Sequence, residues 1–202
     1  MQRRSLAKFI CLLLLTSILS ADGSPTAESL LKKTCEKYQL FDFFDKHRVG
    51  FTFNVELPDK QVRRNWQWHI QADEMFLDGE AVGANQAFIN DSYWLLLPLR
   101  FWHDRSQTDM HLKPATTPLQ QIDAQALTIQ YTSEQGFTPS DTYILYMTEE
   151  GELLEMSYYK ASRATPNRQV TIGGAVDVAG ITFFTEFTGD NFRLFFTDLT
   201  IH

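Results

Sequence analysis

The feature that most constrains this fold is an alternation of apolar and polar side chains, which recurs from position 49 to the C-terminus. Its clearest instance spans 49–57, where small or polar residues separate Val49, Phe51 and Phe53. Because successive side chains of a strand point to opposite faces, this pattern predicts a half-buried strand. Alternation or short apolar runs predict further strands at 66–70, 75–77, 127–132, 143–147, 153–159, 170–178, 181–188 and 192–201.

Short turn-forming segments separate the predicted strands. They include Pro58-Asp59, Glu149-Glu150-Gly151, Ala179-Gly180 and Gly189-Asp190-Asn191. Closely spaced strands with such short connections predict an antiparallel meander that curls into a barrel or a sandwich. The expected fold class is therefore mainly β, with a curved antiparallel sheet.

A helix is predicted before the first strand, over 25–38. Leu30, Leu31 and Cys35 recur there at helical spacing, and Ser24-Pro25 is a suitable start, with a capping hydroxyl and a proline at the first helical position. We expect this helix to bury Cys35 and to cover or plug the sheet.

The segment 91–102 is too apolar for a loop and contains two tryptophans. A strand would have to accommodate Pro98 near its middle, which is costly away from a sheet edge. The pattern therefore favours a short buried helix over a strand. Asp91 or Ser92 is the expected helix cap, and Pro98 is expected to end or kink the helix.

The last two predicted strands are apolar on both faces. In 181–188, Phe183 and Phe187 point one way and Phe184 the other. In 192–201, one apolar set opposes another, namely Phe192, Leu194 and Phe196 against Phe195, Leu199 and Ile201. A sheet with one face in water does not need this pattern. We expect either a layer packed on the second face or an apolar cavity lined by it.

The N-terminus has the three-part pattern of a secretory signal peptide. Arg3, Arg4 and Lys8 precede an apolar run over 9–19, and small residues follow. The alternative to a signal peptide is a membrane anchor, but the apolar run is short for a helix that spans a membrane. We therefore expect 1–21 to be a cleaved signal peptide. Its removal would change the net charge from −7 to −10, because it contains three basic residues and no acidic residue.

The remaining chain, 22–202, is expected to form a single domain, and its acidity argues against nucleic acid as a partner. No residue set forms a complete catalytic signature, so we expect neither enzyme activity nor a cofactor. The segment after the apolar stretch has two interpretations, an ordinary polar loop or a metal site. The metal site would be built from His103, Asp104, Asp109 and His111, whose spacing matches no metal motif. The loop is the favoured interpretation.

Three segments resemble LolA-like bacterial proteins. Tyr93-Trp94-Leu95-Leu96 with Pro98 is similar to a motif of that family, and so are 139–146 and Ile181-Thr182-Phe183. The resemblance extends from about Val49 to His202 and is nearest to an uncharacterised branch. It implies an incompletely closed antiparallel β-barrel in the Gram-negative periplasm, with helices covering an apolar concavity that holds acyl chains in relatives.

Residues and resemblance together predict a periplasmic, non-enzymatic, monomeric protein that binds a hydrophobic small molecule or the acyl chain of a lipid or lipoprotein. The alternatives are an envelope protein-interaction module with a filled core and, less favoured, an unrecognised hydrolase. The candidate ligand-binding residues are large aromatics, for each of which an ordinary core position is the alternative: Trp66, Trp68, Tyr93, Trp94, Phe183 and Phe187.

Overall fold

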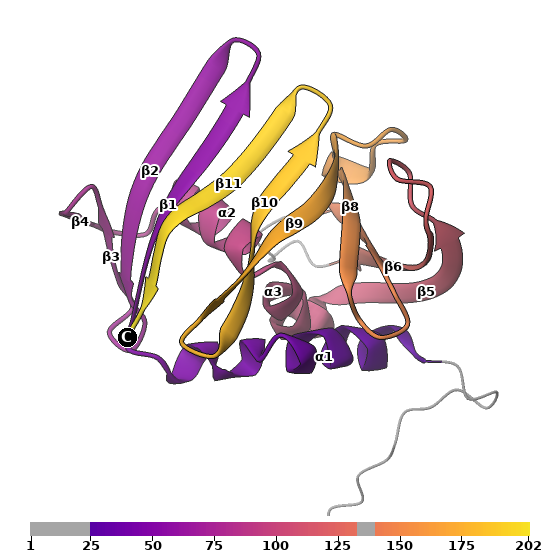
Figure 1. Ribbon diagram of the computed structural model, residues 1–202, viewed down its shortest axis with the longest axis horizontal. Helices are drawn as coiled ribbons and strands as arrows, with labels where there is room; N and C mark the ends of the chain where they lie inside the picture. The colour runs from indigo at the N-terminus through magenta and orange to yellow at the C-terminus, as the bar shows by residue number, and fades with distance from the viewer. Residues whose placement is uncertain (1–24, 133–139) are drawn as a thin grey trace, which may run out of the picture.

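A computed structural model describes residues 25–132 and 140–202, and the predicted signal peptide at 1–21 lies outside the described residues. The described residues form one antiparallel sheet of eleven strands and three α-helices (Figure 1). The strands are β1 (Arg48–Leu57), β2 (Lys60–His69), β3 (Glu74–Leu77), β4 (Glu80–Val82), β5 (Thr108–Thr116), β6 (Asp123–Tyr131), β7 (Thr142–Met147), β8 (Leu153–Tyr159), β9 (Arg168–Val178), β10 (Ile181–Gly189) and β11 (Phe192–Ile201). The helices are α1 (Ala27–Lys37), α2 (Gln86–Leu95) and α3 (Leu97–Asp104), and short 3-10 turns occupy Leu40–Asp45, Arg105–Gln107 and Lys160–Ser162.

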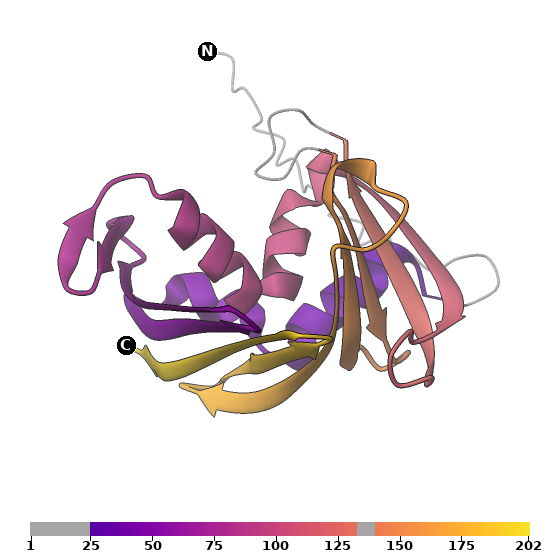
Figure 2. The same cartoon turned by 90° about the horizontal axis from the view of Figure 1, so that it is seen from above.

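The sheet is curved but not closed, as an incompletely closed barrel requires. Its strand order is β4-β3-β2-β1-β11-β10-β9-β8-β7-β6-β5, so β4 and β5 are its two free edges. Strands that follow one another in sequence are neighbours in the sheet, except for β4 and β5, and the first strand pairs with the last. Between the edges the chain passes through α2 and α3, which lie inside the curve of the sheet (Figure 2). The predicted mainly β, partly closed fold is confirmed.

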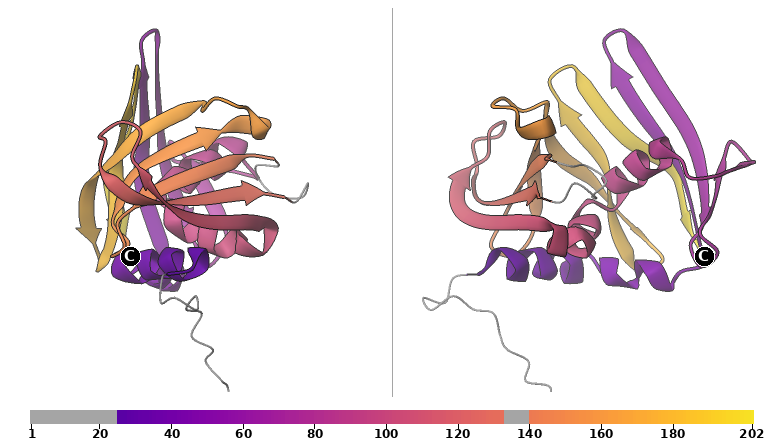
Figure 3. Two further views of the ribbon diagram at one scale, coloured as in Figure 1. Left: turned by 90° about the vertical axis from the view of Figure 1, so that its right-hand side faces the viewer. Right: turned by 180° about the vertical axis from the view of Figure 1, so that it is seen from behind.

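Helix α1 lies across one end of the sheet, beside α3 and β5 (Figure 3). Its N-cap is Thr26, which forms a capping box with Ser29, so the predicted start at Ser24-Pro25 was wrong by two residues. Leu30, Leu31 and Cys35 are fully buried, as predicted.

The apolar segment is helical, as predicted, but it forms two helices. Asn85 caps α2 by accepting hydrogen bonds from the backbone N–H groups of Ala87 and Phe88, whereas Asp91 and Ser92 lie inside that helix. Pro98 lies in the first turn of α3, where it loses no intrahelical hydrogen bond. The predicted cap was therefore wrong, because the observed cap, Asn85, lies six residues before Asp91.

A β-bulge changes the predicted faces of the last strand. The register between β1 and β11 shifts at Asp198, whose φ of 55° lies in the left-handed region. Phe196 and Ile201 are consequently both buried, and Ile201 pairs with the buried Val49. The expected opposition of Ile201 to Phe196 was wrong, because strict alternation does not continue through a bulge.

The predicted polar loop after the apolar segment was also wrong. His103 and Asp104 end α3, and Asp109 and His111 lie exposed on β5. Pro114 is accommodated because β5 is an edge strand. Among the described residues, no three His, Cys, Asp or Glu side chains gather closely enough to hold a metal ion. Within the same residues, no helix is both long and apolar enough to cross a membrane.

Candidate ligand-binding cavity

A cavity of about 360 Å³ lies between α2 and the concave face of the sheet. This volume is within the usual range of pockets that bind small molecules. Its lining comes from α2, the start of α3, five strands and the chain just before β9. The lining residues are Phe53, Val55, Gln86, Ile89, Asn90, Tyr93, Trp94, Leu97, Tyr143, Met156, Tyr158, Asn167, Arg168, Phe192 and Leu194.

The lining is polar at the rim and apolar inside. Gln86, Asn90 and Arg168 are exposed, whereas Phe53 and Met156 are buried. No aspartate or glutamate contributes to the lining. An elongated apolar group could therefore enter from the rim and lose contact with water along its length.

Two of the six predicted ligand-binding residues, Tyr93 and Trp94, line this cavity. The other four are buried in the core and do not line it, namely Trp66, Trp68, Phe183 and Phe187. Phe187 lies directly behind the lining, with its ring 5.2 Å from that of Trp94.

Most lining residues were not predicted as ligand contacts. Phe53 and Leu194 were on the apolar faces of correctly predicted strands, so the alternation marked them as inward-facing. The alternation does not predict the position of α2. That position leaves Phe53 and Leu194 beside the cavity, whereas Trp66 is covered by the helix.

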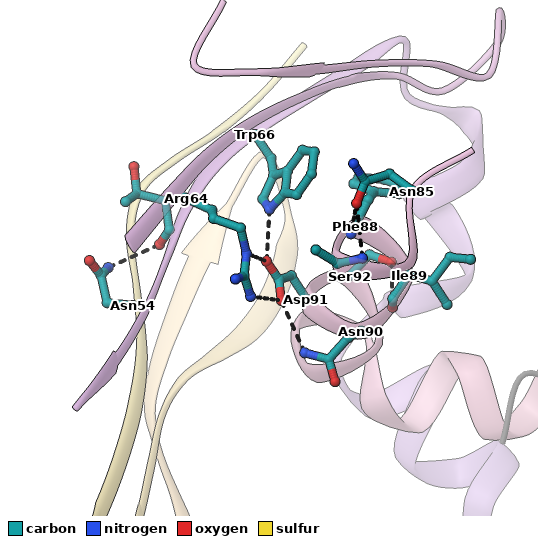
Figure 4. A network of polar contacts seen from close by, with 11 residues as sticks. Asn54, Arg64, Trp66, Asn85, Phe88, Ile89, Asn90, Asp91 and Ser92 are labelled. Atoms are coloured by element: carbon teal, nitrogen blue, oxygen red, sulfur yellow. Dashed lines mark hydrogen bonds and ion pairs between the residues drawn. The ribbon is translucent and has the colours of Figure 1, made fainter. Parts of the chain in front are cut away.

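A buried polar network fixes α2 against the sheet (Figure 4). Asp91 is fully buried and accepts hydrogen bonds from Arg64 Nε at 2.6 Å and Nη2 at 2.7 Å. It also accepts one from Trp66 Nε1 at 2.8 Å and one from Asn90 at 3.0 Å. Arg64 points inward because it shares the face of β2 that carries Trp66. This two-pronged contact orients α2 as well as holding it.

A second cluster joins the end of α2 to α3 and β6. The hydroxyl of Tyr93 donates to Asp104 and also contacts the hydroxyl of Tyr131, which itself donates to Asp104 at 2.8 Å. Burial is the main cause that raises the pKa of both tyrosines. The Asp104 carboxylate, which a phenolate would repel, adds to the shift, so both tyrosines stay neutral donors.

Arg100 lies beneath this cluster. One of its guanidinium nitrogens donates to Ser92 Oγ at 3.1 Å, and the group lies 5.9 Å from the ring centres of both Trp68 and Tyr93. Burial lowers the pKa of Arg100. These contacts hold α2 and α3 together behind the cavity.

The one cysteine among the described residues is not placed for chemistry. Cys35 is fully buried in α1, and burial raises the pKa of its thiol to about 12. The nucleophilic form of cysteine is the thiolate, so this group is inert in the folded protein at neutral pH.

Solved structures share this architecture. A LolA superfamily protein from Nitrosomonas europaea aligns over 89% of this chain and 94% of its own length, with a TM-score of 0.55 and 10% sequence identity. The chain has a LolA-like fold. The resemblance seen in the sequence is thus confirmed for the fold.

Two further solved structures align with the LolA-like fold of this chain at lower scores. A DUF1329 family protein from Desulfovibrio piger has 10% identity and a TM-score of 0.48, with 85% of this chain and 92% of that one covered. A putative outer membrane lipoprotein-sorting protein domain from Vibrio parahaemolyticus has 11% identity and a TM-score of 0.49, with 87% and 93% covered. No protein-family model and no curated protein sequence matches the chain.

Proposed function

We propose that this protein is a periplasmic, non-enzymatic binding protein that holds the acyl chain of a lipid or lipoprotein. The observation that carries the proposal is the cavity under α2, which is apolar inside and polar at its rim. That distribution suits an amphiphile, whose chain leaves water while its headgroup stays at the surface. Each buried methylene would contribute about 0.8 kcal/mol.

The LolA-like fold supports the proposal, because a curved open sheet with helices in its concavity leaves room for a ligand between the layers. The predicted signal peptide supports the periplasmic location. A core filled by its own side chains, as in the interaction-module alternative, does not account for a cavity of about 360 Å³.

We propose that Tyr93 and Trp94 contact the chain directly, since both line the cavity. Trp66, Trp68, Phe183 and Phe187 would meet a ligand only if it displaced the covering helices. The direct contacts therefore belong to the first pair, and the other four aromatics support them from behind.

The test is ligand binding by a variant whose cavity is filled. Ile89→Trp adds bulk to the lining at a half-buried position of α2, and Thr188→Trp adds the same bulk on an exposed position of β10 as the matched control. Protein purified from the periplasm is analysed by native mass spectrometry and lipid extraction.

We expect lipid to accompany the wild type and Thr188→Trp but to be lost from Ile89→Trp. A wild-type protein that carries no lipid and whose melting temperature does not respond to added fatty acid would overturn the proposal. Retention of lipid by folded Ile89→Trp would mean that the ligand binds elsewhere, and would overturn its assignment to this cavity.

A further inference from the structure

Resting on the proposed function, we infer that the bound amphiphile has an anionic headgroup, a carboxylate or a phosphate, which pairs with Arg168 at the cavity rim. Arg168 is the first residue of β9 and is exposed where it lines the cavity. Its guanidinium lies 4.9 Å from the ring centre of Phe192, another lining residue. The positive charge is therefore held over the apolar entrance.

The guanidinium of Arg168 has hydrogen-bond donors available for a ligand. One nitrogen donates to the backbone oxygen of Asn167 at 2.8 Å. In the described part of the chain, no aspartate or glutamate oxygen lies within 4 Å of it. The other lining residues contribute no carboxylate, although the chain as a whole has a net charge of −7.

Arg193 provides a comparison within the same molecule. It also stacks on a phenylalanine, with its guanidinium 4.3 Å from the ring centre of Phe195, and it is also exposed. Arg193, however, pairs with Glu186 at 2.8 Å and with Glu56 at 3.4 Å, and it does not line the cavity. Of these two described arginines, Arg168 is the one without a carboxylate partner, and it is also the one that lines the cavity.

The chemistry of the guanidinium defines the headgroup that fits. Its planar fork donates two parallel hydrogen bonds to the oxygens of a carboxylate or a phosphate. The remaining rim residues, Gln86, Asn90 and Asn167, are neutral and impose no charge preference of their own. An ester or alcohol headgroup would gain less, because it offers no negative charge to Arg168.

The test compares three amphiphiles with the same chain: hexadecanoate, its uncharged methyl ester, and hexadecyl phosphate. Dissociation constants are measured at pH 8 for the wild type, Arg168→Gln and the control Arg193→Gln. We expect the wild type and the control to bind at least one anion about fivefold more tightly than the ester. Arg168→Gln should bind all three as weakly as the wild type binds the ester.

The outcomes separate the inference from the proposed function. Equal affinity of the wild type for the ester and both anions would overturn the inference while leaving acyl binding intact. So would an anion preference that survives in Arg168→Gln. Failure of all three amphiphiles to bind would overturn the proposed function itself. A preference for only one anion supports the inference and identifies the headgroup.

Discussion

The contact between Asp91 and Arg64 makes the sharpest prediction about stability. Replacing Asp91 with alanine removes the acceptor of four hydrogen bonds from a position with no exposed side-chain surface. The change leaves the Arg64 guanidinium and the Trp66 indole N–H without their partner. We expect a large loss of stability, because buried donors that lose their acceptor cannot all turn to water.

The magnitude follows from burial. Breaking a buried ion pair by removing one partner costs about 3–5 kcal/mol. The Arg64 side chain is 26% exposed, so water can partly solvate the freed guanidinium. We therefore expect the lower end of that range, about 3 kcal/mol, for Asp91→Ala. A chain of this size loses about 2–4 °C in melting temperature per kcal/mol, which gives a decrease of about 6–12 °C.

The assay is thermal and urea unfolding followed by tryptophan fluorescence. Glu186→Ala is the matched control, because Glu186 pairs with Arg193 at 2.8 Å, a distance close to that of the buried pair. The side chains of this control pair are 44% and 42% exposed. We expect a far smaller decrease in melting temperature for Glu186→Ala, since exposed ion pairs contribute little.

A double variant tests the physical cause. Adding Arg64→Met to Asp91→Ala removes the unpaired charge, so the double variant should be more stable than Asp91→Ala alone. The reasoning is refuted if Asp91→Ala lowers the melting temperature no more than Glu186→Ala does. It is also refuted if the two substitutions at Asp91 and Arg64 destabilise additively.

Three further predictions concern other buried groups. Burial and Asp104 raise the pKa of Tyr131, so the folded state binds the phenolic proton more tightly than the unfolded state does. The free energy of unfolding should therefore decrease as the pH rises above the ordinary tyrosine pKa of about 10. Tyr131→Phe should reduce that decrease when unfolding is measured as a function of pH. Cys35, whose pKa is raised to about 12, should react with a thiol reagent at pH 8 only after denaturant is added; rapid reaction of the native protein would contradict its burial. Gly151 has a φ of +81°, and a Cβ there would lie 2.9 Å from Thr34 Oγ1. Gly151→Ala should therefore lower the free energy of unfolding, measured in urea, by about 2 kcal/mol or more. The control Gly79→Ala should lower it less, because Gly79 has a φ of +90° but open space around it.

Much of the fold could be predicted from local patterns. The strands that carry Phe51, Leu145 and Phe183 were found because alternation and turn residues are both local signals. Strand β5 was missed because Met110 and Leu112 are its only large apolar residues and Pro114 disfavours a strand. A proline is tolerated in a strand at the edge of a sheet. The position of β5 at the edge follows from the strand order, which the sequence of this segment alone does not reveal.

The cavity was predictable only in part, because its shape depends on contacts between distant residues. Arg64 and Asp91 are 27 positions apart, and neither matches a motif. One signal was present: Arg64 shares an inward face with Trp66 and Trp68, and a charge at such a position requires a buried partner. The identity of that partner depends on where α2 crosses the sheet, which alternation does not determine.

The open cavity can be traced to the way α2 is held. Because β4 and β5 are opposite edges of the sheet, the chain between them has to cross from one edge to the other, and α2 and α3 make this crossing over the concave face (Figure 2). Directional polar contacts fix α2 in that crossing, at Asp91 to β2 and at Tyr93 to α3 and β6. Such contacts set the position of the helix axis, whereas apolar packing alone would let the helix settle onto the sheet until the gap was filled. Ile89 and Trp94 therefore face a space that the anchors prevent from closing, and the same polar residues that stabilise the fold keep the cavity open.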